Sequence, residues 1–100
     1  MFRYIEHKGG FLREDKSNKV DYTLIPHEIL TDLAIHYTEG AKKHGIDNWK
    51  KSKDNKGFLK SAYRHFIAIL LGKEDEDHVS ALIWNVSCYK WHKNKYKCLA

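Results

Sequence analysis

The chain has 100 residues, enough for one domain with a single hydrophobic core. Hydrophobic residues make up 42% and charged residues 31%, with six glycines and one proline, so the composition excludes a disordered or fibrous chain. Eighteen lysines and arginines against thirteen acids give a formal charge of +5. This excess favours either an anionic partner or ordinary solubility.

The sequence argues against a membrane or secreted setting. The longest apolar run, residues 66–71, is far shorter than the roughly 20 residues that cross a bilayer. Residues 1–5 lack the basic and apolar pattern of a secretion signal. Cys88 and Cys98 are too few for a disulfide or metal framework. We therefore expect a cytoplasmic protein without a membrane partner.

The first half of the chain predicts an arm, a helix and a loop. Residues 1–21 show no sustained helical period, so we expect an N-terminal arm that is extended or forms a short hairpin. Apolar positions with helical spacing follow Pro26 and predict a first helix that stops at Gly45. Residues 46–57 then predict a polar, lysine-rich loop with Trp49 as its aromatic anchor.

The second half predicts two more helices. Apolar positions over 58–71 end at Gly72, and a third periodic segment covers 79–89 after an acidic run at 74–77. After about Trp91 the chain becomes rich in lysine. We expect an all-α, three-helix domain over 22–92 and a basic tail over 93–100. Apolar and aromatic side chains around the last helix exceed what one seam covers, which favours a homo-oligomer.

Acidic residues and histidines offer two candidate metal sites. Glu28, Asp32 and His36 lie at helical spacing with Glu39, so they share one side of the first helix and could hold Mg²⁺ or Mn²⁺. The alternative is a solvated polar face. At most one or two of the acids at 74–77 could coordinate a metal, and the rest would cap the third helix. His78 there shares a helix side with Asn85, although a lone histidine near a helix start is more often structural.

The basic segment over 42–64 suits a phosphate chain. Arg64 can donate two parallel hydrogen bonds to phosphate, and Trp49 or Tyr37 could stack on a base. The alternatives are a solvated lysine loop and a Trp49 side chain that only anchors it. No helix combines a dense basic face with base-reading Asn or Gln, so a nucleic-acid partner is the weaker prediction. Walker, dinucleotide-binding and nucleophile-elbow motifs are absent from the sequence.

An ordered series of short motifs resembles a known family. The motifs are YTLIPHE at 22–28, EGAKKHG at 39–45, DNWK at 47–50 and RH at 64–65, followed by His78 and the WN pair at 84–85. Together they resemble the phage and bacterial domain at the N-terminus of dATP/dGTP diphosphohydrolases, over about residues 19–89. The resemblance implies an all-α nucleotide-handling domain related to MazG-like pyrophosphohydrolases. Those enzymes use acids and Mg²⁺ to split a nucleoside triphosphate into monophosphate and pyrophosphate, often as oligomers.

The family motifs imply roles for residues at matching positions, with some departures. Thr23 stands where the family often has Asp, and Ala81 where it has a further His. The acidic loop before His78 is shortened, and the ExxE and ExxD pair of the MazG-like enzymes is missing. The matching positions are Glu28, Lys42, Lys43, Asn48, Trp49, Arg64, His65, His78 and Asn85. Loss of a metal ligand would leave binding intact and remove hydrolysis.

These observations combine into one leading hypothesis and two alternatives. The leading hypothesis is a purine nucleotide-binding domain, phage-encoded and acting in the host cytoplasm, that hydrolyses the α–β phosphate bond with Mg²⁺ or Mn²⁺. Its metal ligands would be Glu28, Asp32, Asp75 and Asp77; its substrate-binding residues Lys42, Lys43, Asn48, Trp49, Arg64 and Asn85; and its catalytic residues His65 and His78. The second hypothesis is a non-catalytic sponge that needs no metal and sequesters a nucleotide, such as a cyclic or ADP-ribose-type immune signal. The third is a nucleic-acid interaction module.

Overall fold

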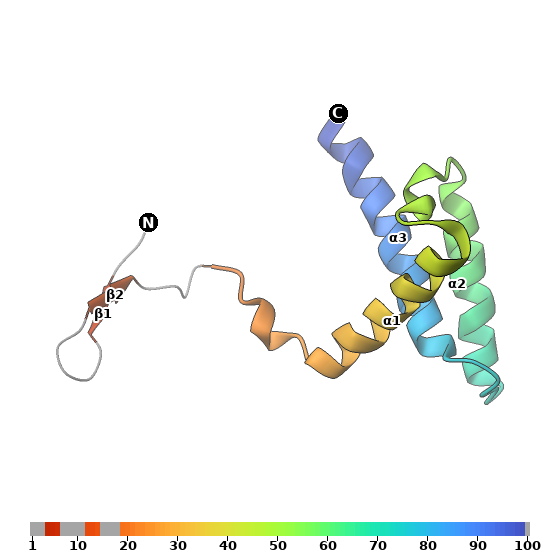
Figure 1. Ribbon diagram of the computed structural model, residues 1–100, viewed down its shortest axis with the longest axis horizontal. Coiled ribbons are helices and arrows are strands. Elements are labelled where there is room, and N and C mark those ends of the chain that lie inside the picture. Colours follow the sequence, from red (N-terminus) through yellow and green to blue (C-terminus); the bar gives the residue numbers. More distant parts are fainter. Residues whose placement is uncertain (1–3, 7–11, 15–18, 100) are drawn as a thin grey trace.

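Three α-helices make up most of the protein, as the sequence predicted. The computed structural model describes residues 4–6, 12–14 and 19–99 (Figure 1). Its helices are α1 (His27–His44), α2 (Asn55–Leu70) and α3 (His78–Leu99), with short 3-10 turns η1 (Tyr22–Leu24) and η2 (Asn48–Lys51). The all-α, three-helix fold class is therefore confirmed. No described helix combines the length and apolarity that a bilayer crossing requires.

Two short strands precede the helices. Strand β1 (Tyr4–Glu6) pairs antiparallel with β2 (Leu12–Glu14), and Ile5 lies opposite Arg13. The pair lies apart from the helices in Figure 1. The rest of the arm predicted over 1–21 lies mostly outside the described residues.

Helix α1 begins and ends where its sequence signals predict. Pro26 precedes it, and the Pro26 carbonyl accepts hydrogen bonds from the backbone N–H groups of Ile29 and Leu30. Glu28 lies in the first turn, where the helix dipole favours an acid. The helix stops at Gly45, whose φ of 96° suits glycine and whose N–H donates to the Ala41 carbonyl at 2.9 Å.

The other two helices are longer than their apolar periods predicted. Helix α2 begins at Asn55 rather than Phe58, because the Asp54 carboxylate caps it by accepting a 3.1 Å hydrogen bond from the Gly57 N–H. Helix α3 continues to Leu99, so the basic tail predicted over 93–100 is helical up to that residue. Lysine is a good helix former, and neither glycine nor proline interrupts residues 92–99. Ala100 lies outside the described residues.

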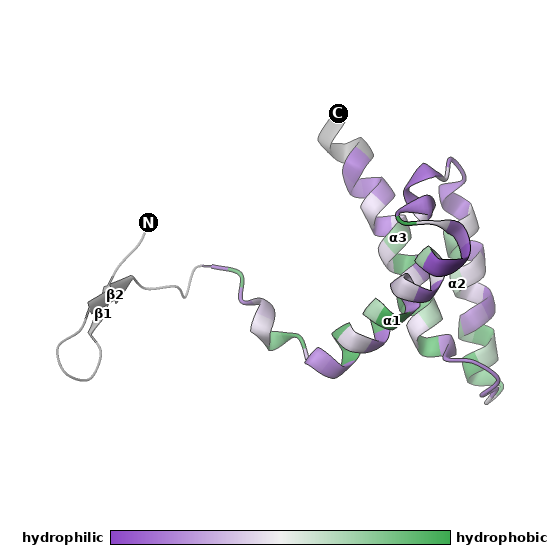
Figure 2. Cartoon of the chain, viewed as in Figure 1, coloured by the Kyte–Doolittle hydropathy of each residue, from purple (hydrophilic) through white to green (hydrophobic). Residues whose placement is uncertain are grey.

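Small buried residues hold α2 against α3. Ala62 and Ala68 on α2 are buried, as are Ala81 and Cys88 on α3. Small side chains allow two helix backbones to approach closely, so these helices run side by side (Figure 1). The C-terminal half of α1 packs across α3, whereas its first turns project beyond the pair and carry exposed apolar side chains (Figure 2). Packing is therefore concentrated where the three helices meet.

Candidate functional site

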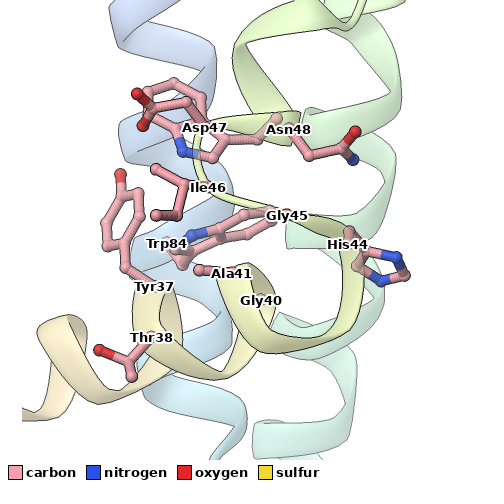
Figure 3. A pocket seen from close by; sticks show the side chains of 11 residues that line it. Tyr37, Thr38, Gly40, Ala41, His44, Gly45, Ile46, Asp47, Asn48 and Trp84 are labelled. Atoms are coloured by element: carbon pink, nitrogen blue, oxygen red, sulfur yellow. The ribbon is translucent and has the colours of Figure 1, made fainter.

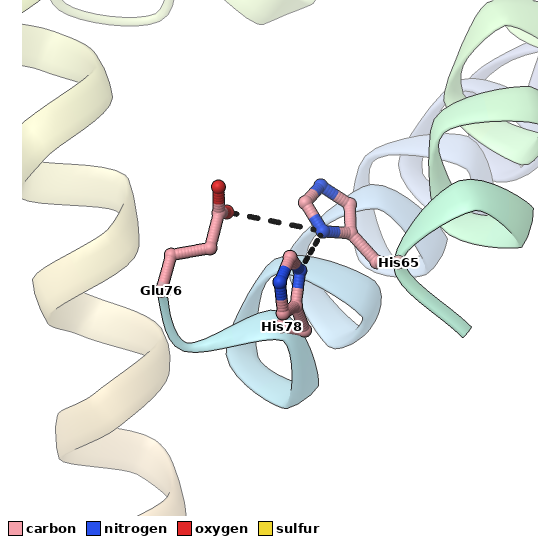
Figure 4. Close-up of side chains that lie close together, drawn as sticks. All are labelled: His65, Glu76 and His78. Carbon is pink, nitrogen blue, oxygen red and sulfur yellow. Dashed lines mark hydrogen bonds and ion pairs between the residues drawn. The ribbon is translucent and has the colours of Figure 1, made fainter. Parts of the chain in front are cut away.

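Two histidines and a glutamate converge where α2, α3 and the loop between them meet. His65 lies on α2, His78 is the first residue of α3, and Glu76 lies in the connecting loop (Figure 4). The Nδ1 atoms of the two histidines are 2.8 Å apart, and His65 Nδ1 is 3.8 Å from Glu76 Oε1. His78 is buried, and the His65 side chain is only 21% exposed. We call these three residues the imidazole cluster.

Asp75 and Asp77, both predicted as metal ligands, instead contact the start of α3. Asp75 Oδ1 lies 2.7 Å from His78 Nε2, and this hydrogen bond is the main reason that the pKa of Asp75 lies below its usual value. Asp77 accepts hydrogen bonds from the Ser80 backbone N–H at 3.0 Å and from the Ser80 hydroxyl at 2.6 Å. These bonds lower the pKa of Asp77 and cap the helix. Asp75 therefore orients His78, and Asp77 fixes the turn that carries it.

His36 on α1 lies near enough to the imidazole cluster to interact with it electrostatically. Burial lowers the pKa of His36 most, nearby His65 lowers it further, and Glu76 and Asp77 oppose the shift. Its ring centroid is also 5.3 Å from that of Trp84 on α3. His36 therefore links the imidazole cluster to the aromatic side chains beside it.

A hollow with aromatic walls lies next to His36, between the end of α1 and α3. Its volume is about 270 Å³, near the lower end for small-molecule sites. Figure 3 shows Tyr37 and Trp84 facing it, with the turn that includes Asn48 along one side. The lining residues are Tyr37, Thr38, Gly40, Ala41, His44, Gly45, Ile46, Asp47, Asn48, Trp49 and Trp84. We call this space the aromatic hollow.

Hydrogen bonds fix the Tyr37 ring at the wall of the aromatic hollow. The Ser87 hydroxyl donates to the Trp84 carbonyl at 2.8 Å, so it accepts from the Tyr37 hydroxyl, which lies 2.6 Å away. Burial raises the pKa of Tyr37 above its ordinary value. The Tyr37 ring is therefore held in one orientation before any ligand binds.

Gly40 leaves open space in the same wall. A Cβ atom placed on Gly40, which lies inside α1, would meet no heavy atom within 4 Å apart from its own stretch of the helix backbone and its chain neighbours. Glycine in a helix interior costs roughly 0.5–1 kcal/mol relative to alanine, and no close packing here explains that cost. Close approach of a ligand to the helix backbone is the other physical use of such a glycine.

Trp49 is held in place by other aromatic rings. Its ring centroid lies 5.1 Å from that of Trp91 and 5.7 Å from that of Tyr37, both at steep angles. His92 Nε2 lies 3.1 Å from the Trp49 carbonyl and donates a hydrogen bond to it. Trp49 therefore anchors its loop and also lines the aromatic hollow, so both interpretations of this residue fit the structure.

The remaining predicted residues lie outside the two features. Glu28 is exposed and pairs with His27 at 3.1 Å, and Asp32 is exposed on the same helix. Neither belongs to a group of three potential ligand atoms within 4.8 Å of one another in the described chain. With Asp75 and Asp77 engaged at α3, the four predicted carboxylates do not form one oxygen cage for Mg²⁺ within a single described chain.

The predicted substrate-binding residues also differ in their surroundings. Arg64 is exposed on α2 beside His65. Lys42 is exposed and lies 3.8 Å from Glu39, whereas Lys43 is near enough to His36 to lower its pKa. Asn85 is buried, and its side-chain N–H donates to the Ala81 carbonyl at 2.8 Å. The structure therefore brings Asn48 and Trp49 together at the aromatic hollow and leaves Arg64 and Lys42 at the surface.

Sequence reasoning did not single out three residues that the structure places at the site. Glu76 was one of four consecutive acids, and only the loop geometry separates it from its neighbours. Trp84 and Gly40 occur inside the family motifs, but spacing along the chain gives no sign that they line one hollow. The mid-helix glycine was the one signal that could have indicated Gly40.

Comparison with known protein families gives a match over most of the chain. The sequence model of the family described as dATP/dGTP diphosphohydrolase, N-terminal, matches residues 11–99. This range includes all three helices, the imidazole cluster and the aromatic hollow. Neither the curated proteins nor the solved structures gave a match.

Proposed function

Because this chain belongs to the family of dATP/dGTP diphosphohydrolase N-terminal domains, we propose that it binds a purine deoxynucleoside triphosphate. The observation that carries the proposal is the aromatic hollow, in which Gly40 leaves free space, together with the imidazole cluster near it. The hollow offers flat aromatic walls for a base, and stacking on such rings is worth about 1–3 kcal/mol per base. Its volume suits a base better than a whole nucleotide.

The phosphates would extend from the hollow along α1 toward the imidazole cluster. Trp84 lines the hollow and contacts His36, and His65 lies near enough to His36 to lower the pKa of His36. Lys43 adds positive charge on this path, since it lies near enough to His36 to lower the pKa of His36. Arg64, beside His65, would donate charge-assisted hydrogen bonds to phosphate. The polar end of the ligand thus meets imidazoles and cations, and its base meets aromatic carbon.

The reaction proposed for this site is hydrolysis of the α–β phosphate bond. Water adds to the α-phosphorus, the bond to the β-phosphate oxygen breaks, and a deoxynucleoside monophosphate and pyrophosphate leave. Of the two predicted catalytic histidines, His65 is better suited to orient the water. Both ring nitrogens of His78 are engaged, Nε2 by Asp75 and Nδ1 by His65. Among the described residues, the His65 contacts involve its Nδ1 atom alone (Figure 4).

Sequestration without hydrolysis is the second candidate, and one observation favours it. The acids Glu28 and Asp32 lie apart from the imidazole cluster, so the carboxylate-rich site of MazG-like enzymes is not assembled within one described chain. A protein that has the aromatic hollow but lacks the catalytic acids would bind a nucleotide and release it unchanged.

The test is to incubate the purified protein with each of the four deoxynucleoside triphosphates and with Mg²⁺ or Mn²⁺. Binding is followed by fluorescence of the tryptophans at the hollow, and reaction by pyrophosphate release. Preference for dATP or dGTP with pyrophosphate release supports the enzyme, and stoichiometric uptake with recovery of intact ligand supports sequestration. No binding at millimolar nucleotide would refute both.

Matched variants locate the phosphate end. Arg64→Ala should weaken binding by about 1.5–3 kcal/mol if the guanidinium donates to phosphate. Lys53→Ala removes an exposed cation that does not line the aromatic hollow, and it should change the affinity little. Equal effects of the two substitutions would show that only general charge matters and would remove the role of Arg64.

A further inference from the structure

We propose that His65, His78 and Glu76 form a binding site for a divalent transition-metal ion rather than for Mg²⁺. This inference concerns an ion that the protein holds by itself, and it stands whether or not a nucleotide binds. Its donor atoms are His65 Nδ1, His78 Nδ1 and a Glu76 carboxylate oxygen, which all lie within 4.8 Å of one another.

Three separate elements bring these atoms together. His65 comes from α2, His78 from the first turn of α3 and Glu76 from the loop, and Figure 4 shows the three side chains directed toward a common point. The turn is fixed by the Asp77 cap on Ser80 and by a 3.0 Å hydrogen bond from the His78 N–H to the Glu76 carbonyl. The backbone of the turn that carries Glu76 and His78 is therefore fixed.

Asp75 sets the ring of His78 in the orientation that a metal ligand needs. Its carboxylate lies 2.7 Å from His78 Nε2 and accepts a hydrogen bond from the N–H group of that nitrogen. His78 Nδ1 then carries a lone pair, which accepts a hydrogen bond from His65 Nδ1 at 2.8 Å, and a bound ion would take the place of the proton between them. Histidines that bind metals almost always donate their other ring N–H to a carboxylate or carbonyl in this way.

The separation of the two nitrogens also suits an ion. Metal–nitrogen bonds of about 2.0–2.1 Å at a right angle would place two ligands about 3 Å apart, and the two Nδ1 atoms are 2.8 Å apart. Two imidazoles and one carboxylate on one side of an ion leave further positions open, as in facial sites that hold iron. Magnesium prefers an all-oxygen shell, so this donor set favours Mn²⁺, Fe²⁺, Co²⁺ or Zn²⁺.

The experiment titrates tag-free, chelator-treated protein with Co²⁺, Zn²⁺, Mn²⁺ and Mg²⁺ in the absence of nucleotide. Calorimetry gives stoichiometry and affinity, and the visible absorption of bound Co²⁺ reports the nitrogen ligands. We expect one Co²⁺ or Zn²⁺ per chain with a micromolar dissociation constant and at least a hundredfold weaker binding of Mg²⁺. Absence of Co²⁺ and Zn²⁺ binding below 100 μM, or equal affinity for Mg²⁺, would overturn the proposal.

Variants assign the ligands. Glu76→Gln changes an exposed carboxylate and should weaken Co²⁺ binding at least tenfold without unfolding the chain. Asp75→Asn should weaken it roughly tenfold to a hundredfold, because the orienting acceptor is lost. His65→Ala should abolish the Co²⁺ spectrum, whereas His27→Ala, which removes an exposed histidine outside the cluster, should leave it intact. An unchanged spectrum in both Glu76→Gln and His65→Ala would refute the site.

Because these titrations contain no nucleotide, they separate the metal site from the nucleotide proposal. If the protein binds Co²⁺ but neither dATP nor dGTP, the metal site is supported and the proposed function is refuted. If it binds nucleotide but not Co²⁺, the proposed function is supported and the metal site is refuted.

Discussion

Replacement of Gly40 by alanine separates the stability of α1 from the function of the aromatic hollow. The Cβ of the alanine would enter open space, since no heavy atom beyond the chain neighbours and the local helix backbone lies within 4 Å of its position. The change therefore brings the full gain in helix propensity, about 0.5–1 kcal/mol. For a domain of this size, that gain raises the melting temperature by about 2–8 °C.

The same methyl group would lie against a base in the aromatic hollow. Forcing an extra carbon into a filled site costs about 1–3 kcal/mol, which corresponds to roughly 5- to 150-fold weaker binding. Gly40→Ala should therefore be more stable than the wild type and bind dATP or dGTP less tightly. Melting followed by circular dichroism and nucleotide titration followed by tryptophan fluorescence measure the two effects on one sample.

Thr31→Ala is the matched control for this experiment. Thr31 is exposed on the projecting half of α1, and alanine there also improves helix propensity. Its melting temperature should rise with no change in nucleotide affinity. If Gly40→Ala is stabilised and binds nucleotide as tightly as the wild type, the hollow does not hold the base. If it is destabilised, the space beside Gly40 is not open.

Three other predictions concern the helix caps, the core and the projecting half of α1. Asp54→Ala should lower the free energy of unfolding in urea by about 1 kcal/mol, because α2 loses its cap, whereas Asp54→Asn should retain nearly all of it; equal losses in both would contradict the capping role. Burial raises the pKa of the Cys88 thiol to about 11, so in a Cys98→Ala background iodoacetamide at pH 8 should alkylate native protein about a hundredfold more slowly than urea-unfolded protein. Because the pKa of the folded-state thiol is raised, burial of the thiol stabilises the fold fully below the pKa of the unfolded chain, and this stabilisation is lost as the pH rises toward 11. Equal alkylation rates in native and unfolded protein would show that Cys88 is accessible. Leu30 is an apolar side chain, 57% exposed on the projecting half of α1. If this surface joins two copies of the chain, Leu30→Glu should shift the homo-oligomer toward monomer in light scattering, whereas Thr31→Glu should not. A monomeric wild type would contradict the expected assembly.

The helices could be predicted because their signals are local. Pro26 and Gly45 define α1 through backbone geometry that depends only on the neighbouring residues. The missed start of α2 has the same character, since Asp54 is a helix-capping residue three positions before Gly57. The apolar period showed only the part of α2 that packs, whereas the cap showed where hydrogen bonding begins.

The site could be predicted only in part, because its residues come together through packing. His65 and His78 were candidates from the family motifs, but their 2.8 Å contact depends on how α2 and α3 lie against each other. The acids show the same limit. Asp75, Glu76 and Asp77 are consecutive in the chain, yet one orients a histidine, one faces the imidazole cluster and one caps a helix.

The sequence by itself determined the three-helix class, the ends of α1 and the family, because each depends on residue type and spacing along the chain. Only the tertiary structure decided which polar side chains share a site. Small buried side chains allow α2 and α3 to pack closely, and this packing places His65 beside His78; these side chains are Ala62, Ala68, Ala81 and Cys88. Glu28 stays exposed, because the first turns of α1 project beyond the other two helices (Figure 1). Convergence of side chains from separate helices is a property of that packing, which no local pattern encodes.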